Sequence, residues 1–219
     1  VVSSNMTELS NESADALVEK VDIVICCIDR WDEKSFQNIR RGANFTTVVE
    51  NTRSLVNRRK RGGRAEIVVK ALDLDQSSNE WVEFSRFWSA LGARPLLAWL
   101  NSWAGTFPTI RQAASLPIPQ SGPSRVPCTD LWFKMVINWK GAVQMCCFDS
   151  EYAFPVGADG RPAWLREVWQ GSVIRDLRRA HSEGHYATTR RCDTCDSWGT
   201  QEEFDRYVEF NEASYFSVF

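Results

Sequence analysis

The chain has 219 residues, of which 43% are hydrophobic and 25% charged, and these proportions are typical of a globular protein rather than a disordered one. Its 26 basic and 28 acidic residues leave a formal net charge of −2, which gives no electrostatic signature of a protein that binds nucleic acid or an anionic membrane. No apolar stretch approaches the roughly 20 residues that a membrane-spanning helix needs, so we expect one large domain or two small ones, with neither nucleic acid nor a membrane among the partners.

The first hundred residues alternate between the patterns of strands and of helices. Residues 21–28 form an almost unbroken apolar run, as expected for a parallel strand that is buried on both faces. Ser10, Asn44 and Ser77 are good N-cap residues, and apolar residues at helical spacing follow each of them. This alternation with short connections predicts an α/β fold with a parallel sheet and right-handed crossovers. The predicted strands are residues 1–4, 21–28, 66–72 and 95–100.

The start of the chain carries no signal peptide and no natural start, since it begins at Val1 and Met6 is internal. Four strands are too few to close a barrel or to complete a doubly wound sheet. We therefore expect an N-terminal part of the protein to precede residue 1.

Composition changes after residue 105, because the following segment contains five prolines and little periodicity, which is typical of a linker. Beyond it, two alternating runs flank Gly141 and predict a β-hairpin over residues 131–147. A helix is predicted from Ser172, and a final helix in the acidic, aromatic tail that begins at Glu202. The predicted organisation is a first domain at residues 1–105, a linker at 106–127 and a small cysteine-rich α+β domain at 128–219.

The seven cysteines are odd in number, and two pairs are adjacent in the sequence: Cys26 with Cys27, and Cys146 with Cys147. Neighbouring cysteines rarely fit a disulfide framework, so the pattern favours metal ligation in a reducing compartment. We therefore expect a cytoplasmic protein.

Four cysteines form the strongest candidate site, and two of them, Cys192 and Cys195, make a Cys-x-x-Cys motif. Cys128 precedes the predicted hairpin and Cys146 lies near its end, so the hairpin and the following helix can bring four thiolates together. Such a set can hold a tetrahedral zinc ion or an iron–sulfur cluster. Zinc ribbons usually supply two Cys-x-x-Cys motifs and this chain has one, which favours iron weakly. An enzyme, and a non-catalytic binding module stabilised by zinc or by a cluster, both fit this pattern.

The spacing of these cysteines resembles that of a known family. Twelve residues separate Cys128 from Gly141, four separate Gly141 from Cys146, and the Cys-x-x-Cys motif at Cys192 and Cys195 follows after a gap. This order resembles the SPASM domain of radical S-adenosylmethionine (SAM) enzymes. The fuller version of that domain has further cysteines for a second cluster, and this sequence has none after Cys195. The resemblance therefore implies one auxiliary 4Fe-4S cluster with a cysteine at all four corners.

The resemblance covers about residues 127–198 closely, and the first hundred residues are similar, more diffusely, to the second half of the partial (β/α) barrel of the same enzymes. Residues 24–29 stand where the family has an apolar strand ending Ser-Ile-Asp-Gly, and residues 39–45 resemble its Ile-Arg-x-Gly-x-Asn-Phe. This likeness places Cys27 at the family's serine and Arg40 near the bound cofactor, which implies that both line a SAM pocket. The alternatives are a buried core cysteine and a solvated arginine.

The resemblance implies an enzyme when the protein is intact. The Cys-x-x-x-Cys-x-x-Cys motif that binds the SAM-cleaving cluster belongs upstream of residue 1, so these 219 residues alone are expected not to cleave SAM. With SAM and a second 4Fe-4S cluster, the family generates a 5′-deoxyadenosyl radical that abstracts hydrogen from substrate. The implied partners are a peptide or a small molecule of the sugar type as substrate, and an electron donor such as flavodoxin or ferredoxin.

This assignment leaves the thiol of Cys147 outside the set of cluster ligands. Side chains alternate along a strand, so Cys146 and Cys147 are expected to point to opposite faces, with Asp149 on the same face as Cys147. A free thiol can donate a hydrogen atom to a carbon radical, and a carboxylate can accept the proton released in a dehydrogenation. Cys147 and Asp149 are therefore candidate catalytic residues. The alternative is that Cys147 is a small buried apolar residue.

The two histidines have no predicted ligand. His181 falls on the apolar face of its predicted helix with Leu177, and His185 directly follows Gly184. We expect both histidines to be structural or exposed.

Overall fold

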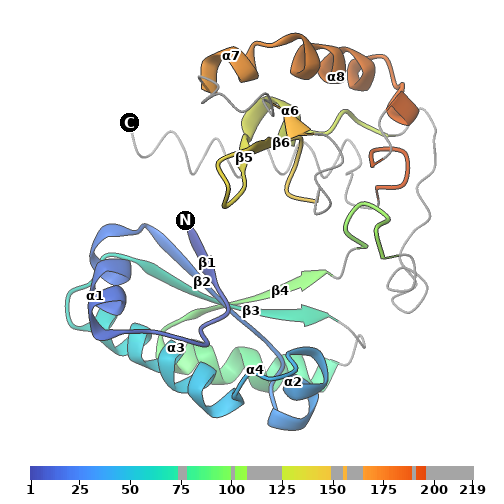
Figure 1. Ribbon diagram of the computed structural model, residues 1–219. Coiled ribbons are helices and arrows are strands. Elements are labelled where there is room, and N and C mark those ends of the chain that lie inside the picture. The colour runs from blue at the N-terminus through green and yellow to red at the C-terminus, as the bar shows by residue number, and fades with distance from the viewer. Residues whose placement is uncertain are drawn as a thin grey trace. The chain divides into compact units, whose positions relative to one another are not determined.

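The computed structural model describes residues 1–73, 78–99, 102–107, 125–148, 155–156, 165–188 and 191–195. The chain divides into two compact units, Val1–Leu100 and Asn101–Phe219, which are taken in turn (Figure 1). Within the described residues, no helix is long and apolar enough to cross a membrane.

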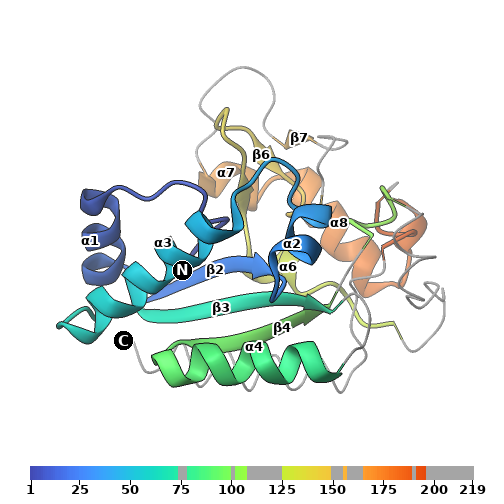
Figure 2. The same ribbon diagram turned by 90° about the horizontal axis from the view of Figure 1, so that it is seen from below.

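The first unit is a parallel four-stranded sheet in the order β1-β2-β3-β4, so each strand pairs with the next one along the chain. Its helices pack on one face of the sheet, as the view from below shows (Figure 2). Its strands are β1 (Val2–Ser4), β2 (Ile23–Asp29), β3 (Glu66–Asp73) and β4 (Arg94–Trp99). Its helices are α1 (Asn11–Lys20), α2 (Glu33–Ile39), α3 (Phe45–Lys60) and α4 (Ser78–Leu91).

Alternate residues of the two central strands form the core beneath these helices. Val24 and Cys26 of β2 lie beside Ile67 and Val69 of β3, and all four are at most 3% exposed. A sequential strand order with the helices on one face is how a (β/α) barrel is built, whereas a doubly wound sheet places helices on both faces. The predicted parallel α/β sheet is confirmed. The partial barrel stays a prediction, because each of the outer described strands pairs on one side only.

Two of the three N-cap residues predicted from the sequence are confirmed. Ser10 and Asn44 cap α1 and α3 through their side chains, as predicted. Ser77, the predicted cap of α4, lies outside the described residues. Helix α2 was not predicted, because it has seven residues and buries one side chain, Phe36, so no helical periodicity could develop.

The second unit combines a small antiparallel sheet in the order β5-β6-β7 with short helices. Its strands are β5 (Val136–Ile137), β6 (Val143–Gln144) and β7 (Pro155–Val156). Its helices are α6 (Asp130–Phe133), α7 (Leu165–Trp169), α8 (Ser172–Ser182) and the 3-10 helix η1 (Tyr186–Thr188).

The predicted hairpin around Gly141 is confirmed but is shorter than expected. Residues 131–133 belong to helix α6 instead of a strand, and Lys134 forms an ion pair with Asp130 across that helical turn, at 2.6 Å. An ion pair four residues apart stabilises a helical turn and not a strand. The helix predicted from Ser172 is confirmed as α8. The helix predicted in the tail from Glu202 lies outside the described residues.

Candidate metal centre

The candidate cysteines lie in three loops of the second unit. Cys128 precedes α6, Cys146 follows β6, and the Cys-x-x-Cys motif follows η1. Cys146 and Cys192 pack against the apolar core of this unit. The core positions the loops, and it consists of Leu131, Val143, Met145, Val168, Ile174 and Leu177.

The structure brings these four thiols close enough for their charges to interact. Burial raises the pKa of Cys128 to about 12, and the charge of Asp130 and then the thiolates of Cys195 and Cys192 act in the same direction. Burial also raises the pKa of Cys146 to about 12, with further contributions from Cys147, Cys192 and Cys128. Each of the four cysteines therefore lies near at least one of the others. Bringing four thiolates together in a half-buried site is costly unless a metal balances their charge.

The four cysteines offer the ligand chemistry of an iron–sulfur cluster. A zinc site draws four ligands to about 2.0–2.3 Å from one centre, whereas a 4Fe-4S cluster separates its four thiolates by placing one at each corner. Sulfur is also the only ligand type in the set, as in most such clusters. The residues present therefore fit a cysteine-ligated iron–sulfur cluster.

A short turn at residues 102–107 holds the loop that carries the Cys-x-x-Cys motif. Thr194, inside the motif, donates a hydrogen bond from Oγ1 to the carbonyl of Ala104 at 2.9 Å, and Arg191 donates to Thr106 Oγ1 at 2.8 Å. The rings of Trp103 and Phe148 meet edge to face with their centroids 5.7 Å apart, and Phe148 lies two residues after Cys146. The turn spans the end of the predicted first domain and the start of the predicted linker, yet it packs within the second unit.

This turn has a backbone that few sequences can adopt. Trp103, Ala104 and Gly105 have φ values of 54°, 54° and 81°, three left-handed residues in succession. Such strain persists only where the surrounding structure enforces it, and it is common at functional sites. Apart from a single glycine, nothing in the sequence predicts the turn, because its partners in the Cys-x-x-Cys loop lie about ninety residues away along the chain.

Replacing Gly105 with alanine is expected to loosen the Cys-x-x-Cys loop. A Cβ at Gly105 would lie 2.6 Å from both Cβ and Oγ1 of Thr194. Gly141 is a matched control, since it has the same φ of +81° and nothing within 4 Å of an added Cβ. Both alanines cost about 1–2 kcal/mol for the left-handed backbone, and the clash at Gly105 adds about 1–3 kcal/mol. Denaturant unfolding of the two variants measures the difference, and equal losses would contradict the clash.

Cys147 differs from its neighbour Cys146 in being exposed. Its thiol lies near the Asp130–Lys134 ion pair, and partial burial of the sulfur, then the charge of Asp130, raises the pKa of Cys147, while Lys134 opposes them. Exposure of the residue does not fit the alternative of a buried apolar cysteine. Asp149, the other candidate catalytic residue, lies outside the described residues.

In the first unit, Arg40 is half-buried and pairs with a buried carboxylate. Its Nε and Nη2 lie 2.7 and 2.5 Å from Oδ2 of Asp29, whose side chain is fully buried at the end of β2. Cys27 is 7% exposed, and its sulfur lies 3.3 Å from Ser3 Oγ. No interaction between Cys27 and Arg40 occurs within the part of the chain that is described. Sequence reasoning missed Asp29, whose signal was an acidic residue at the carboxyl end of a buried strand.

The histidines behave as expected. His185 is exposed, and His181 is structural, with 1% of its surface exposed. Its Nδ1 accepts a hydrogen bond from the backbone N–H of Cys128 at 3.2 Å. Burial, and then the positive charge of Arg125, lower the pKa of His181 to about 4, so the imidazole is neutral at neutral pH.

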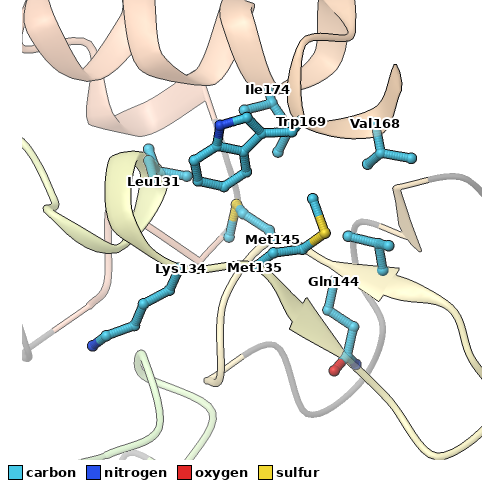
Figure 3. Close-up of a pocket in the computed structure, with 9 residues that line it drawn as sticks. Leu131, Lys134, Met135, Gln144, Met145, Val168, Trp169 and Ile174 are labelled. Carbon is cyan, nitrogen blue, oxygen red and sulfur yellow. The ribbon is translucent and has the colours of Figure 1, made fainter. Parts of the chain in front are cut away.

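A small cavity lies inside the second unit, where side chains of α6, α7, α8 and the hairpin meet (Figure 3). Its volume is about 10 Å³, whereas one water molecule needs about 10–15 Å³. The cavity is therefore a gap in the packing and not a substrate site. Its walls include two methionines, whose flexible side chains fill irregular space, and they comprise Leu131, Lys134, Met135, Val143, Gln144, Met145, Val168, Trp169 and Ile174.

Comparison with known families finds a match within the second unit. Residues 128–196 match the family model of SPASM, an iron–sulfur cluster-binding domain. The match begins at Cys128 and ends one residue after Cys195, so it contains all four candidate cysteines. It spans about a third of the chain. Comparisons with curated proteins and with solved structures gave no match. The resemblance to SPASM inferred from the cysteine spacing is confirmed, and residues 128–196 are similar to an iron–sulfur cluster-binding domain.

Proposed function

We propose that the chain is part of a radical SAM enzyme and that Cys128, Cys146, Cys192 and Cys195 hold one auxiliary 4Fe-4S cluster. The observation that carries the proposal is the convergence of these four thiols within the SPASM match. When bound, the cluster supplies one-electron transfer. Four cysteines leave no corner open for a substrate, so the domain serves electron transfer or the closing of a substrate cavity.

The first unit is proposed to contribute to the SAM pocket. Ligands of parallel sheets bind at the carboxyl ends of the strands, and Asp29 ends β2 with its carboxylate bonded to Arg40. This pair holds the Arg40 guanidinium in place near that edge, and Cys27 lies two residues before Asp29. The proposed substrate is a peptide or a molecule of the sugar type, and the proposed electron donor belongs to the flavodoxin or ferredoxin class.

Cys147 is proposed as a hydrogen-atom donor to a substrate radical. In that step the S–H bond breaks and a C–H bond forms, and one electron from the donor protein with one proton restores the thiol. The support is that Cys147 is exposed while the adjacent Cys146 packs against the core with Cys192. Asp149 is proposed to accept a proton where the reaction is a dehydrogenation. Full turnover by Cys147→Ser and Asp149→Asn variants of the intact enzyme, with their clusters retained, would end both assignments.

Anaerobic reconstitution with ferrous iron and sulfide tests the cluster. We expect about four irons per chain, brown absorbance and a paramagnetic signal on reduction. A thiol-reactive label should then modify Cys147 and spare Cys146, and after denaturation with a chelator it should modify both. Stoichiometric zinc without iron would instead support the second candidate, a zinc-stabilised binding module. Labelling of Cys146 with protection of Cys147 would reverse the ligand assignment of that pair.

A further inference from the structure

Helix α8 directs two polar side chains at the segment that carries the first cysteine. Arg178 and His181 are three residues apart and therefore lie on one face of the helix. His181 Nδ1 accepts from the N–H of Cys128 at 3.2 Å, and Arg178 Nε donates to the carbonyl of Leu131 at 2.9 Å. The helix thus holds the backbone at the start of α6 at two points, one of which is the cysteine itself.

A second set of contacts fixes the same segment three residues earlier. The Tyr186 hydroxyl donates to the carbonyl of Arg125 at 2.8 Å, and the Arg125 guanidinium lies 4.0 Å from the centre of the Tyr186 ring. The rings of Tyr186 and His181 meet edge to face at 5.1 Å. All three side chains belong to buried residues, so residues 125–128 are clamped at both ends. A cation on an aromatic ring and an edge-to-face ring pair each stabilise this arrangement.

A buried histidine at position 181 would destabilise the fold if its side chain served only to fill space. An imidazole that accepts through Nδ1 carries its proton on Nε2, and within the described residues that buried atom has no hydrogen-bond partner. A buried donor without a partner destabilises the fold, and a phenylalanine of similar volume would avoid this cost. The compensating gain is the bond at Nδ1, which satisfies the backbone N–H of the cysteine.

We infer that His181 is a positioning residue for the metal centre, whose unprotonated Nδ1 fixes the backbone of Cys128 so that its thiol faces the other three cysteines before the metal binds. This inference rests on the proposed cluster site. Residues that orient ligands from outside the first coordination sphere typically change metal affinity by about 10-fold to 100-fold when they are replaced.

Substitution of His181 with asparagine or glutamine distinguishes the roles of its two ring nitrogens. In His181→Asn the side-chain oxygen stands near the position of Nδ1, whereas in His181→Gln the amide reaches the position of Nε2, and His181→Phe has neither polar atom. The full chain is reconstituted with ferrous iron and sulfide, and iron loss to a chelator is followed over time. We expect Gln and Phe to lose iron about tenfold faster than wild type or more, and Asn to restore retention. A matched control is His185→Asn, at an exposed histidine near the end of the same helix.

The outcomes separate the inference from the proposed function. Wild-type protein that binds no iron would overturn the cluster assignment and the inference with it. Iron in the wild type, with equal loss from the Asn, Gln and Phe variants, would overturn the inference alone, because volume and not the acceptor would then matter. Retention by all three variants would overturn it as well. If the Phe variant does not fold, the contrast between Asn and Gln still decides.

Discussion

A Cys128→Ala variant is expected to bind less than one iron per chain after reconstitution and to lose the folded second unit. Among its described residues, the core of this unit has six clustered apolar side chains, and its described strands are two residues long. Structural metal sites contribute on the order of 10 kcal/mol to folding, which is as large as the whole stability of a typical domain. The same result is expected for Cys146, Cys192 and Cys195. Iron content and near-ultraviolet circular dichroism measure the two effects.

Cys147→Ala is the matched control for this series. It removes a thiol adjacent to Cys146 from an exposed residue that does not pack against the core. It should keep its iron, and its free energy of unfolding should change by no more than about 0.5 kcal/mol, as for most surface substitutions. A second unit that stays folded and iron-loaded in the Cys128→Ala protein would contradict the assignment of Cys128 as a ligand.

The elements that could be predicted from the sequence are those with a local signal. The strands of the first unit follow from apolar runs, α1 and α3 follow from a cap and a helical repeat, and α8 follows from the helical repeat after Ser172. The strand predicted at residues 131–133 was wrong because alternation over three residues cannot separate a strand from one helical turn. The Asp130–Lys134 ion pair stabilises the helical turn at this position.

The supports of the candidate site could not be predicted, because they join residues far apart in the sequence. The cysteines themselves were found from spacing alone, through a resemblance that the family match then confirmed. The bond from Cys128 to His181 spans 53 positions and that from Thr194 to Ala104 spans 90. Neither His181 nor Ala104 has a sequence signal that distinguishes it from a core or loop residue. Only the folded chain shows that they hold the cysteine loops.

In the first unit, Arg40→Ala is expected to have the largest effect of any single substitution of a charged residue. It would leave the Asp29 carboxylate buried without its cation, and one oxygen of that carboxylate already has no partner within the described residues. Breaking a fully buried pair costs about 3–5 kcal/mol. The Arg40 side chain is 35% exposed, so water replaces part of the lost interaction and we expect about 2–3 kcal/mol. Denaturant unfolding of the 219-residue chain measures it.

A double-mutant cycle distinguishes this cost from lost packing. Asp29 has a φ of 67°, and asparagine tolerates that left-handed backbone, so Asp29→Asn removes the charge without adding strain. Asp29→Asn alone should cost about 1 kcal/mol, because the partly exposed Arg40 can turn to water. In the Asp29→Asn background, Arg40→Ala should then cost less than in the wild type, with a coupling of about 1–3 kcal/mol. Additive losses would mean that Arg40 acts through packing alone. If Arg40→Ala does not lower the free energy of unfolding, the pair does not stabilise the free chain. The role of Arg40 would then lie in binding a ligand.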